Sequence, residues 1–414
     1  MTDPLKFDET SSRLPLSAIR VVEMGRMLAA PLVGQLLGDL GAEVVKIERP
    51  HEGDDFRRYG LVHIEDADGN ATLESAAYTS TNRNKRSLTV DFGRPDGAEI
   101  VRGLARQCDI FIENFKVGGL AKYGLDYASQ RQVNPGVIYL SLTGFGQEGP
   151  YAHRPATDSV FQAMSGLMDL TGEPDGEPVK VGTYAADYTA GLYGALAIMA
   201  ALRHRDRTGE GQHIDLALLD CAIALVSPRS CDYLVSGSVP HRIGNRTPGT
   251  APGQLFRCKD GHLMVQAGSD RMFAALCRVL ERPDVGADPR FATPRMRLQN
   301  IDLLAATLES TFLTRCSREW FDLLSKTQVL TAPIYNVAQC FSDPQVQARE
   351  RRVTAPHPIA GSLDLVASPM RFSATPIRTY GSPPVLGEVV DDVLSNWLGY
   401  DAERIAQLRA AGAV

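Results

Sequence analysis

The 414-residue chain lacks the patterns that mark membrane, secreted and nucleic-acid-binding proteins. Its longest apolar run, residues 192–202, is well short of the roughly 20 residues that span a bilayer, so we expect a core helix there. Residues 1–15 are polar, with no apolar segment behind a basic start, so no signal peptide is predicted. The 43 Lys and Arg residues form no basic block and, with 49 acidic residues, give a formal net charge of -6, which disfavours a nucleic-acid partner.

Metal and disulfide patterns are missing as well. The seven cysteines are scattered without a Cys-x-x-Cys pair, and the eight histidines show no His-Glu-x-x-His spacing. We therefore expect no metal site, no disulfide framework and a location in the reducing cytoplasm. The loop after the first predicted strand has no Gly-x-Gly-x-x-Gly, and neither a P-loop nor a Gly-x-Ser-x-Gly elbow occurs. Standard dinucleotide, nucleoside-triphosphate and serine-hydrolase sites therefore have no support.

What the chain does contain is an alternation of strand and helix patterns. Residues 18–23 and 42–48 are β-branched runs typical of buried strands, and between them lies a helix that Pro31 opens and Gly41 stops. Strand, helix and strand within about 30 residues form the unit of a parallel sheet. The pattern continues with an edge strand at 87–91, a helix at 95–106, and strands at 109–113 and 137–142. The sequence therefore predicts an open α/β sheet.

A different pattern follows this first part of the chain. A hairpin is expected around Asp260-Gly261, because such a pair tolerates the φ angles of a tight turn, and helices are expected at 272–282 and 303–324. The tail is rich in proline and ends in an expected helix at 391–398. The predicted organisation is a large domain at 1–204, a linker at 205–225, a smaller α+β domain at 226–330 and a tail at 331–414 that returns to the large domain.

One acidic residue, Asp187, is a candidate for chemistry. It lies where an extended segment gives way to the apolar run, and Gly191 and Gly194 follow it. An aspartate in this position is most often a helix cap or a residue of the first turn, since its carboxylate accepts hydrogen bonds from the first backbone N–H groups. Beside small residues that let a ligand approach the backbone, it is also a candidate nucleophile or base. The residues alone leave both roles open.

Cations and glycines recur near the ends of the predicted strands. In an open α/β sheet the ligand crevice lies beyond the carboxyl ends of the strands, so this recurrence favours an anionic, phosphate-bearing ligand, although single charges of this kind are commonly only solvated. A second acid, Asp158, is expected to cap a helix that runs through Met164. The strand-end residues are Lys46, Arg49, and the groups at 84–86, 114–116 and 143–146.

Ordered blocks along nearly the whole chain resemble one family, the class III CoA-transferases, which include the α-methylacyl-CoA racemases. The resemblance implies a Rossmann-like large domain formed by the N-terminal part and the tail, a small domain between them, and an interlocked homodimer. It also implies that an acyl-CoA and a carboxylic acid are the substrates, and that no cofactor is required. The blocks are RVVEMGRMLAAPLVGQLLGDLGAEVVKIERP, NRNKRSLTVDF, DIFIENFKVGGLAKYGL, LSLTGFGQEGPYAHRP, DSVFQAMSGLMDLTGEP, ADYTAG, ALRHRDRTGEGQHIDLALLD, SDPQVQARE and PPVLGE.

The resemblance assigns Asp187 as a covalent nucleophile that passes through a mixed anhydride and an aspartyl-CoA thioester. Asp158, Gly249 and Gly253 are candidates for substrate or lid contacts, the two glycines because some members carry a glycine-rich lid in this region. The CoA-contact residues that we carry over or expect from the strand ends are Arg26, Leu28, Ala29, Arg49, Val90, Asp91, Gly93, Asn114, Phe115, Lys116, Lys122, Thr143, Gly144 and Phe145.

Two departures bear on the branch of the family. Racemases carry a histidine where this chain has Thr157, and a threonine hydroxyl is no base near neutral pH. Formyl-CoA:oxalate transferases carry a glutamine where Leu28 stands. The predicted function is therefore transfer of CoA from an acyl-CoA, with succinyl-CoA as one candidate, to a carboxylic acid; the alternatives are a racemase and a CoA-binding protein without catalysis. Arg26, Arg242 and Arg246 are candidate partners for the far carboxylate of a dicarboxylic acid.

Overall fold

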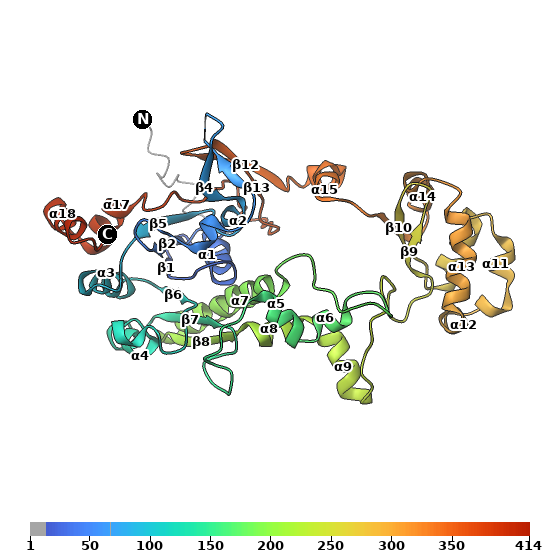
Figure 1. Cartoon of the computed structure of the whole chain (residues 1–414), viewed down its shortest axis with the longest axis horizontal. Coiled ribbons are helices and arrows are strands. Elements are labelled where there is room, and N and C mark those ends of the chain that lie inside the picture. Colours follow the sequence, from blue (N-terminus) through green and yellow to red (C-terminus); the bar gives the residue numbers. More distant parts are fainter. Residues whose placement is uncertain (1–13, 67) are drawn as a thin grey trace. The chain divides into compact units, whose positions relative to one another are not determined.

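The computed structural model describes residues 14–66 and 68–414, and its internal contacts divide the chain into two units (Figure 1). The first, which we call the α/β unit, comprises residues up to Leu167, Val181–Cys231 and Gln347–Val414. The second, the small unit, comprises Met168–Lys180 and Asp232–Val346. Residues 205–225, interpreted from the sequence as a linker, instead carry a strand and a helix of the α/β unit.

A six-stranded parallel sheet forms the centre of the α/β unit, with the strand order β5-β2-β1-β6-β7-β8. Its middle strands are built from Val, Ile, Leu and Phe and are buried on both faces, as parallel strands require. The predicted edge strand at 87–91 is β5, at one edge of the sheet. The strands are β1 (Arg20–Glu23), β2 (Glu43–Glu48), β5 (Lys85–Thr89), β6 (Ile110–Glu113), β7 (Ile138–Thr143) and β8 (Gln212–Ala217).

Two hydrophobic clusters cover the two faces of this sheet. Side chains of α1, α5, α7 and α8 contribute to one cluster, and side chains of α3, α17 and α18 contribute to the other. The mixed α/β fold with a large parallel sheet is therefore confirmed. The helices are α1 (Ala29–Asp39), α3 (Pro95–Ala105), α5 (Asp158–Met164), α7 (Ala185–Thr208), α8 (Leu218–Leu225), α17 (Val390–Leu398) and α18 (Ala402–Ala410).

From Gln347 onward the C-terminal tail belongs to the α/β unit, whereas residues 331–346 of the predicted tail lie in the small unit. The indole Nε1 of Trp397 on α17 donates to Glu43 on β2 at 3.1 Å, and Ile405 and Leu408 of α18 are buried in the same cluster as α3. The remaining elements of this unit are short: η2 (Asp55–Arg58), β3 (His63–Glu65), β4 (Ala71–Ser75), α2 (Ala76–Thr79), η3 (Ala121–Tyr123), α4 (Tyr127–Val133), β12 (Arg352–His357) and β13 (Gly361–Val366).

The small unit has its own core, in which Phe312 lies against Phe256 and Trp320. An antiparallel sheet in the order β11-β10-β9 includes the predicted hairpin at Asp260-Gly261, which joins β9 (Gly253–Arg257) to β10 (His262–Gln266). The other elements are α10 (Asp270–Val279), α11 (Pro283–Ala287), η4 (Pro289–Phe291), α12 (Pro294–Gln299), α13 (Ile301–Phe312), α14 (Ser317–Leu324), β11 (Leu330–Pro333) and α15 (Val337–Ser342), with α6 (Leu167–Leu170), α9 (Ser227–Ser236) and α16 (Pro344–Ala348) at the boundaries in the chain.

Candidate active site

Asp187 lies in the first turn of α7, where Tyr184 is the residue that precedes the helix. The N-cap residue is Tyr184 and Asp187 is the third helical residue, so the interpretation of Asp187 as a helix cap is wrong and its interpretation as a first-turn residue is confirmed. Its carboxyl group is half-buried. Burial raises the pKa of Asp187 to about 7, and the charge of the neighbouring Asp158 contributes to the same shift. A carboxyl group that titrates near neutral pH is well suited to act as nucleophile or base.

Asp158 satisfies the start of α7. Its Oδ1 accepts hydrogen bonds from the backbone N–H of Ala186 at 2.8 Å and of Asp187 at 3.3 Å. We expected Asp158 to cap its own helix, but the residue before α5 is Thr157, and the Asp158 carboxylate is turned toward α7 instead. The backbone N–H groups at the start of α7 need an acceptor, and Asp158, the first residue of α5, supplies it.

Gln162 fixes the orientation of Asp158. It lies four residues further along α5, on the same helix face, and its Nε2 donates to Asp158 Oδ2 at 2.5 Å. The same side chain holds the segment that leads into α7, since its Nε2 donates to the carbonyl of Thr183 at 3.1 Å and its Oε1 accepts from Val181 N–H at 3.0 Å. We call the Asp158 and Gln162 side chains the latch. The sequence analysis overlooked Gln162, although its spacing of four from Asp158 was a usable signal.

The two glycines of α7 let helix α1 approach closely. A Cβ on Gly191 would lie 2.7 Å from Leu32 Cδ2 and 3.1 Å from the carbonyl oxygen of Ala29, and a Cβ on Gly194 would lie 2.8 Å from Val33 Cγ2. The prediction that small residues here admit a ligand to the backbone is therefore wrong for both glycines. They bring the start of α1, with the predicted site residue Ala29, against the helix that carries Asp187.

The loop before α1 is under backbone strain. Met27 has a φ of 66°, in the left-handed region that residues other than glycine seldom adopt. Hydrogen bonds hold the loop in this conformation. Met27 N–H donates to Asp54 Oδ1 at 3.0 Å. The backbone N–H of Arg26 donates to Asn114 Oδ1 at 3.0 Å, and Asn114 Nδ2 donates to the carbonyl of Arg26 at 2.8 Å. Strain of this kind concentrates at functional sites. The structure thus joins the predicted residues Arg26 and Asn114 and adds Met27.

Aromatic side chains flank this region. Leu28 is buried in a small cluster with Phe56 and Tyr78. At the start of α7, a hydrogen bond with the Tyr59 phenol, partial burial and the charges of Asp187 and Asp158 together raise the pKa of Tyr184 to about 12. Tyr59 and Tyr184 are both partly exposed, so phenol groups border the candidate nucleophile. The sequence offered no signal for Tyr59, which is distant from Asp187 along the chain.

Three loops at the carboxyl edge of the sheet are joined by aromatic contacts. Phe92 lies edge-on to Phe115 at 5.6 Å and to Tyr123 at 5.3 Å between ring centroids, and the guanidinium of Arg26 lies 5.6 Å from the Phe115 ring. This arrangement brings the predicted segment with Gly93 beside the segment with Phe115. Lys116 and Lys122 are exposed on these loops, and Lys122 lies 4.7 Å from the Tyr123 ring.

An open pocket of about 760 Å³ lies at this edge. Its lining includes Arg49 and Asp91, as predicted for the CoA site, together with Arg94 and with Arg409 from the tail. Arg49 pairs with Glu52 at 2.9 Å, and both partners are exposed. Exposed ion pairs are weak and easily rearranged, so these guanidinium groups remain able to bind phosphate. The pocket suits the phosphate-bearing part of a nucleotide.

Other predicted CoA-contact residues form hydrogen bonds or packing contacts within the α/β unit. Val90 is fully buried, and its N–H donates to the carbonyl of Glu48 at 2.8 Å. Thr143 Oγ1 accepts from Gly146 N–H at 3.1 Å. A Cβ on Gly144 would lie 2.9 Å from the ring of Phe161 on α5, and Phe145 lies edge-on to the same ring at 5.4 Å. The loop after β7 thus supports the helix that carries the latch.

The strand-end cations Lys46 and Lys85 are not available to a ligand. Both are fully buried, and both ammonium groups pair with Glu23, at 3.0 Å and 2.8 Å. Lys46 also pairs with Asp54 at 2.9 Å. The prediction that these two lysines bind an anionic ligand is therefore wrong, because buried charges of opposite sign already occupy them.

The predicted lid residues lie in the small unit. Gly249 has a φ of 71° in a turn, and Gly253 is buried as the first residue of β9, where its carbonyl accepts from Thr247 N–H at 2.7 Å. Arg242 pairs with Asp169 at 2.9 Å, and Arg246 pairs with Asp302. These partners lie within the small unit, and both aspartates are exposed.

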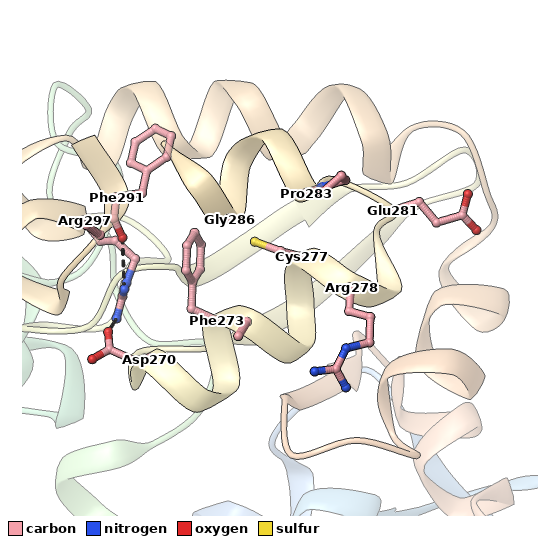
Figure 2. Close-up of a pocket in the computed structure, with 11 residues that line it drawn as sticks. Asp270, Phe273, Cys277, Arg278, Glu281, Pro283, Gly286, Phe291 and Arg297 are labelled. Carbon is pink, nitrogen blue, oxygen red and sulfur yellow. Dashed lines mark hydrogen bonds and ion pairs between the residues drawn. The ribbon is translucent and has the colours of Figure 1, made fainter. Parts of the chain in front are cut away.

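A second pocket, of about 530 Å³, lies in the small unit (Figure 2). Its buried Arg297 bonds to the carbonyl of Phe291 and to Asp270, and the Phe273 ring lies 4.6 Å from the guanidinium. Figure 2 shows Arg278 pointing away from this group. The polar groups do not converge on one point, so the pocket lacks the arrangement expected of a catalytic centre.

Comparisons with known proteins bear on the family of this chain. Residues 16–389 match the model of CoA-transferase family III. The succinate–glutarate CoA-transferase of Agrobacterium fabrum is 43% identical over 94% of this chain and 97% of its own. The succinyl-CoA:glutarate CoA-transferase of Homo sapiens is 36% identical over 97% of this chain and 90% of its own. A crystal structure of a CAIB/BAIF family protein from Brucella suis has a TM-score of 0.85 and 42% identity, and covers 93% of this chain and 100% of that one.

Proposed function

This chain belongs to CoA-transferase family III and is a CoA-transferase, and we propose that it works through a covalent bond between CoA and Asp187. The family expected from the sequence blocks is thereby confirmed. The observation that carries the covalent proposal is the half-buried carboxyl group of Asp187, with a pKa raised to about 7, in the first turn of α7.

The proposed reaction has four balanced steps. The Asp187 carboxylate attacks the thioester carbonyl of the donor, the C–S bond breaks, and CoA leaves as a thiolate, which gives a mixed anhydride. The thiolate then attacks the Asp187 carbonyl and releases the donor acid as a carboxylate. The acceptor carboxylate attacks the resulting aspartyl-CoA thioester and frees the thiolate again. Finally the thiolate attacks the acceptor carbonyl, and Asp187 leaves as a carboxylate.

The raised pKa of Asp187 serves both halves of this cycle. A more basic carboxylate is a better nucleophile, and near pH 7 a substantial fraction is still ionised. The latch keeps the start of α7 fixed through bonds to backbone atoms, so the nucleophile is held by a rigid helix rather than by a loop. The strained loop at Met27 lies at the start of α1, against the same helix, and is proposed to face the thioester.

We propose dicarboxylic acids of four or five carbons as donor and acceptor. The similar enzymes from Agrobacterium fabrum and Homo sapiens are named for succinate or succinyl-CoA and for glutarate. In this chain Arg26 has an exposed guanidinium whose partner, Asp55 at 3.2 Å, is itself exposed. A substrate carboxylate can replace so weak a partner. Arg26 is therefore the proposed contact for the far carboxylate.

The decisive test is trapping of the intermediate. Wild-type protein and an Asp187→Asn variant are mixed with succinyl-CoA, and intact mass is recorded after rapid denaturation. The wild type should gain the mass of CoA less one water, and hydroxylamine should remove it, whereas Asp187→Asn should gain none. Asp220→Asn, which changes an exposed acid in the first turn of α8, serves as the matched control and should behave as wild type. A labelled Asp187→Asn protein would refute the assignment.

A homodimer is also proposed, and the surface of α7 supports it. By length and composition α7 could cross a membrane, yet Ala190, Gly191 and Ile198 on one side of it are buried in the α/β unit. On the other side Leu192 and Leu196 are 57% and 64% exposed. An exposed apolar helix face indicates a partner surface, and a second copy of this chain is the proposed occupant, interlocked as the family resemblance implies.

The dimer is tested with Leu196→Glu. Static light scattering after size exclusion should show a dimer for the wild type and a smaller species for the variant, because a buried glutamate would lack a partner. Leu313→Glu, at an exposed leucine of the small unit, is the control and should remain dimeric. A wild-type monomer at micromolar concentration would refute the proposal.

A cytoplasmic location, suggested by the scattered cysteines, stays part of the proposed function.

A further inference from the structure

The Asp158 carboxylate of the latch affects Asp187 through its charge and makes no hydrogen bond to the Asp187 carboxyl group among the described residues. Asp158 is 6% exposed and Gln162 is fully buried. Three N–H donors hold the Asp158 carboxylate: the backbone of Ala186 and Asp187, and Nε2 of Gln162. These donors include the backbone N–H of Asp187 itself, so the Asp158 carboxylate lies within hydrogen-bonding distance of the residue that carries the nucleophile.

The groups that pack along α7 beyond its first turn are apolar. Helix α1 presents Leu32 to Gly191 and Val33 to Gly194, while β7 presents Leu140 and β8 presents Leu216 to Gly194. Tyr184 is neutral near pH 7, since its hydrogen bond with Tyr59, partial burial and the nearby carboxylates raise its pKa from 10.0 to about 12. Helix α8 carries Asp220, which is exposed. Among the residues that the structure describes, Asp158 is the charged group that opposes ionisation of Asp187.

Resting on the function proposed above, we propose that Asp158 is a positioning residue whose fixed negative charge favours the states in which Asp187 is uncharged, namely the mixed anhydride and the CoA thioester. Repulsion between the two carboxylates exists only while Asp187 is a free anion. When Asp187 becomes acylated the anionic charge leaves on CoA or on the released acid, and the repulsion disappears. The like-charged neighbour therefore shifts the equilibrium toward the covalent intermediate.

Protonation and thioester formation are linked by this argument. Both neutralise Asp187, so the neighbouring charge must favour both by the same factor. Burial is the larger cause of the raised Asp187 pKa and Asp158 the smaller, so we expect loss of the Asp158 charge to lower that pKa by about one unit. A change of one pKa unit corresponds to about a tenfold change in the equilibrium constant for thioester formation from the ionised enzyme.

The test uses Asp158→Asn, which keeps an oxygen acceptor for the two backbone donors and removes the charge. The enzyme is equilibrated with mixtures of succinyl-CoA and succinate of varied ratio, and the thioester fraction is measured by intact mass. At pH 9 the variant should need about ten times more succinyl-CoA relative to succinate for half-labelling. At pH 5 both proteins are mostly protonated at Asp187, so the deficit should vanish.

Two further proteins separate charge from simple damage. Asp158→Glu retains the charge and should lie closer to wild type at pH 9 than Asp158→Asn does, and Asp220→Asn should match wild type throughout. The role of Asp158 would be overturned if Asp158→Asn showed the same labelling deficit at pH 5 and pH 9. It would also be overturned if the wild type formed the thioester and Asp158→Asn showed no deficit at either pH. A wild type that forms no thioester at all would instead refute the covalent route, and with it this proposal.

Discussion

The Asp187→Asn variant should be more stable than the wild type although it is inactive. In the folded protein the Asp187 pKa is raised from 3.8 to about 7, so the folded state holds its proton more tightly than the unfolded chain does. Unfolding then becomes easier as pH rises from about 4 to about 7, and above this range the penalty is constant. An uncharged amide at the same position carries no such penalty.

The size of the effect follows from the two pKa values. The full shift, about three units, corresponds to about 4 kcal/mol above pH 8, of which about 2.6 kcal/mol accrues between pH 5 and pH 8. Since Asp187 is only half-buried and solvent screens part of this energy, we expect the advantage of Asp187→Asn to grow by about 2 kcal/mol over that range. With an unfolding entropy of about 2.1 cal/mol/K per residue, a unit of this size should gain about 3 °C in melting temperature relative to the wild type.

Melting is followed by circular dichroism for both proteins at pH 5, 6.5 and 8. The quantity compared is the difference between variant and wild type, which cancels every other titrating group that the two share. Asp220→Asn is run in parallel, because loss of an exposed acid should give no pH-dependent difference. A variant advantage that is the same at pH 5 and pH 8 would show that Asp187 carries its ordinary pKa, and the reasoning on its reactivity would fall with it.

Three further outcomes are expected. For succinyl-CoA, kcat/KM should rise with pH through about 7 and be about tenfold lower at pH 6 than at pH 8; a flat profile would contradict the raised pKa of Asp187. Gly191→Ala should destabilise the α/β unit by about 1–3 kcal/mol, because its Cβ meets Leu32, whereas Gly182→Ala, where a Cβ meets nothing, should not. Turnover of a 2-methylacyl-CoA in deuterated water should leave the α-carbon unlabelled, since Thr157 replaces the base of a racemase; mass spectrometry reads the label.

The sheet and its covering helices were predictable because their signals are local. The apolar runs at 42–48, 109–113 and 137–142 correspond to β2, β6 and β7, and Pro31 and Gly41 bracket α1 within two residues. The strand β8 was not recognised as part of the sheet, because it lies at the edge and apolar residues alternate with polar ones in its sequence, QHIDLA. Helix α18 was missed because its sequence, AERIAQLRA, offers only two large apolar residues, Ile405 and Leu408, as a helical signal.

The site was predictable in its members but not in its contacts. Asp187 and Asp158 both stood out as acids at helix starts, yet only the fold shows that one supplies the acceptor for the other's helix. Sequence spacing also could not tell the buried Lys46 from the exposed Arg49, which differ in position by three residues, because the acids that neutralise Lys46 come from β1 and from the loop after β2. Long-range ion pairs leave no local pattern.

The close contact between α1 and α7 limits where new specificity can arise. Two glycines set the separation of these helices, and any side chain there meets Leu32 or Val33 at less than 3 Å. The nucleophile and the loop that ends at Ala29 thus sit on a frame that substitutions cannot widen without loss of stability. Acceptance of a longer or shorter acid must then evolve through the side chains around this frame, such as Tyr59, Tyr184 and Arg26, while the helices themselves remain fixed.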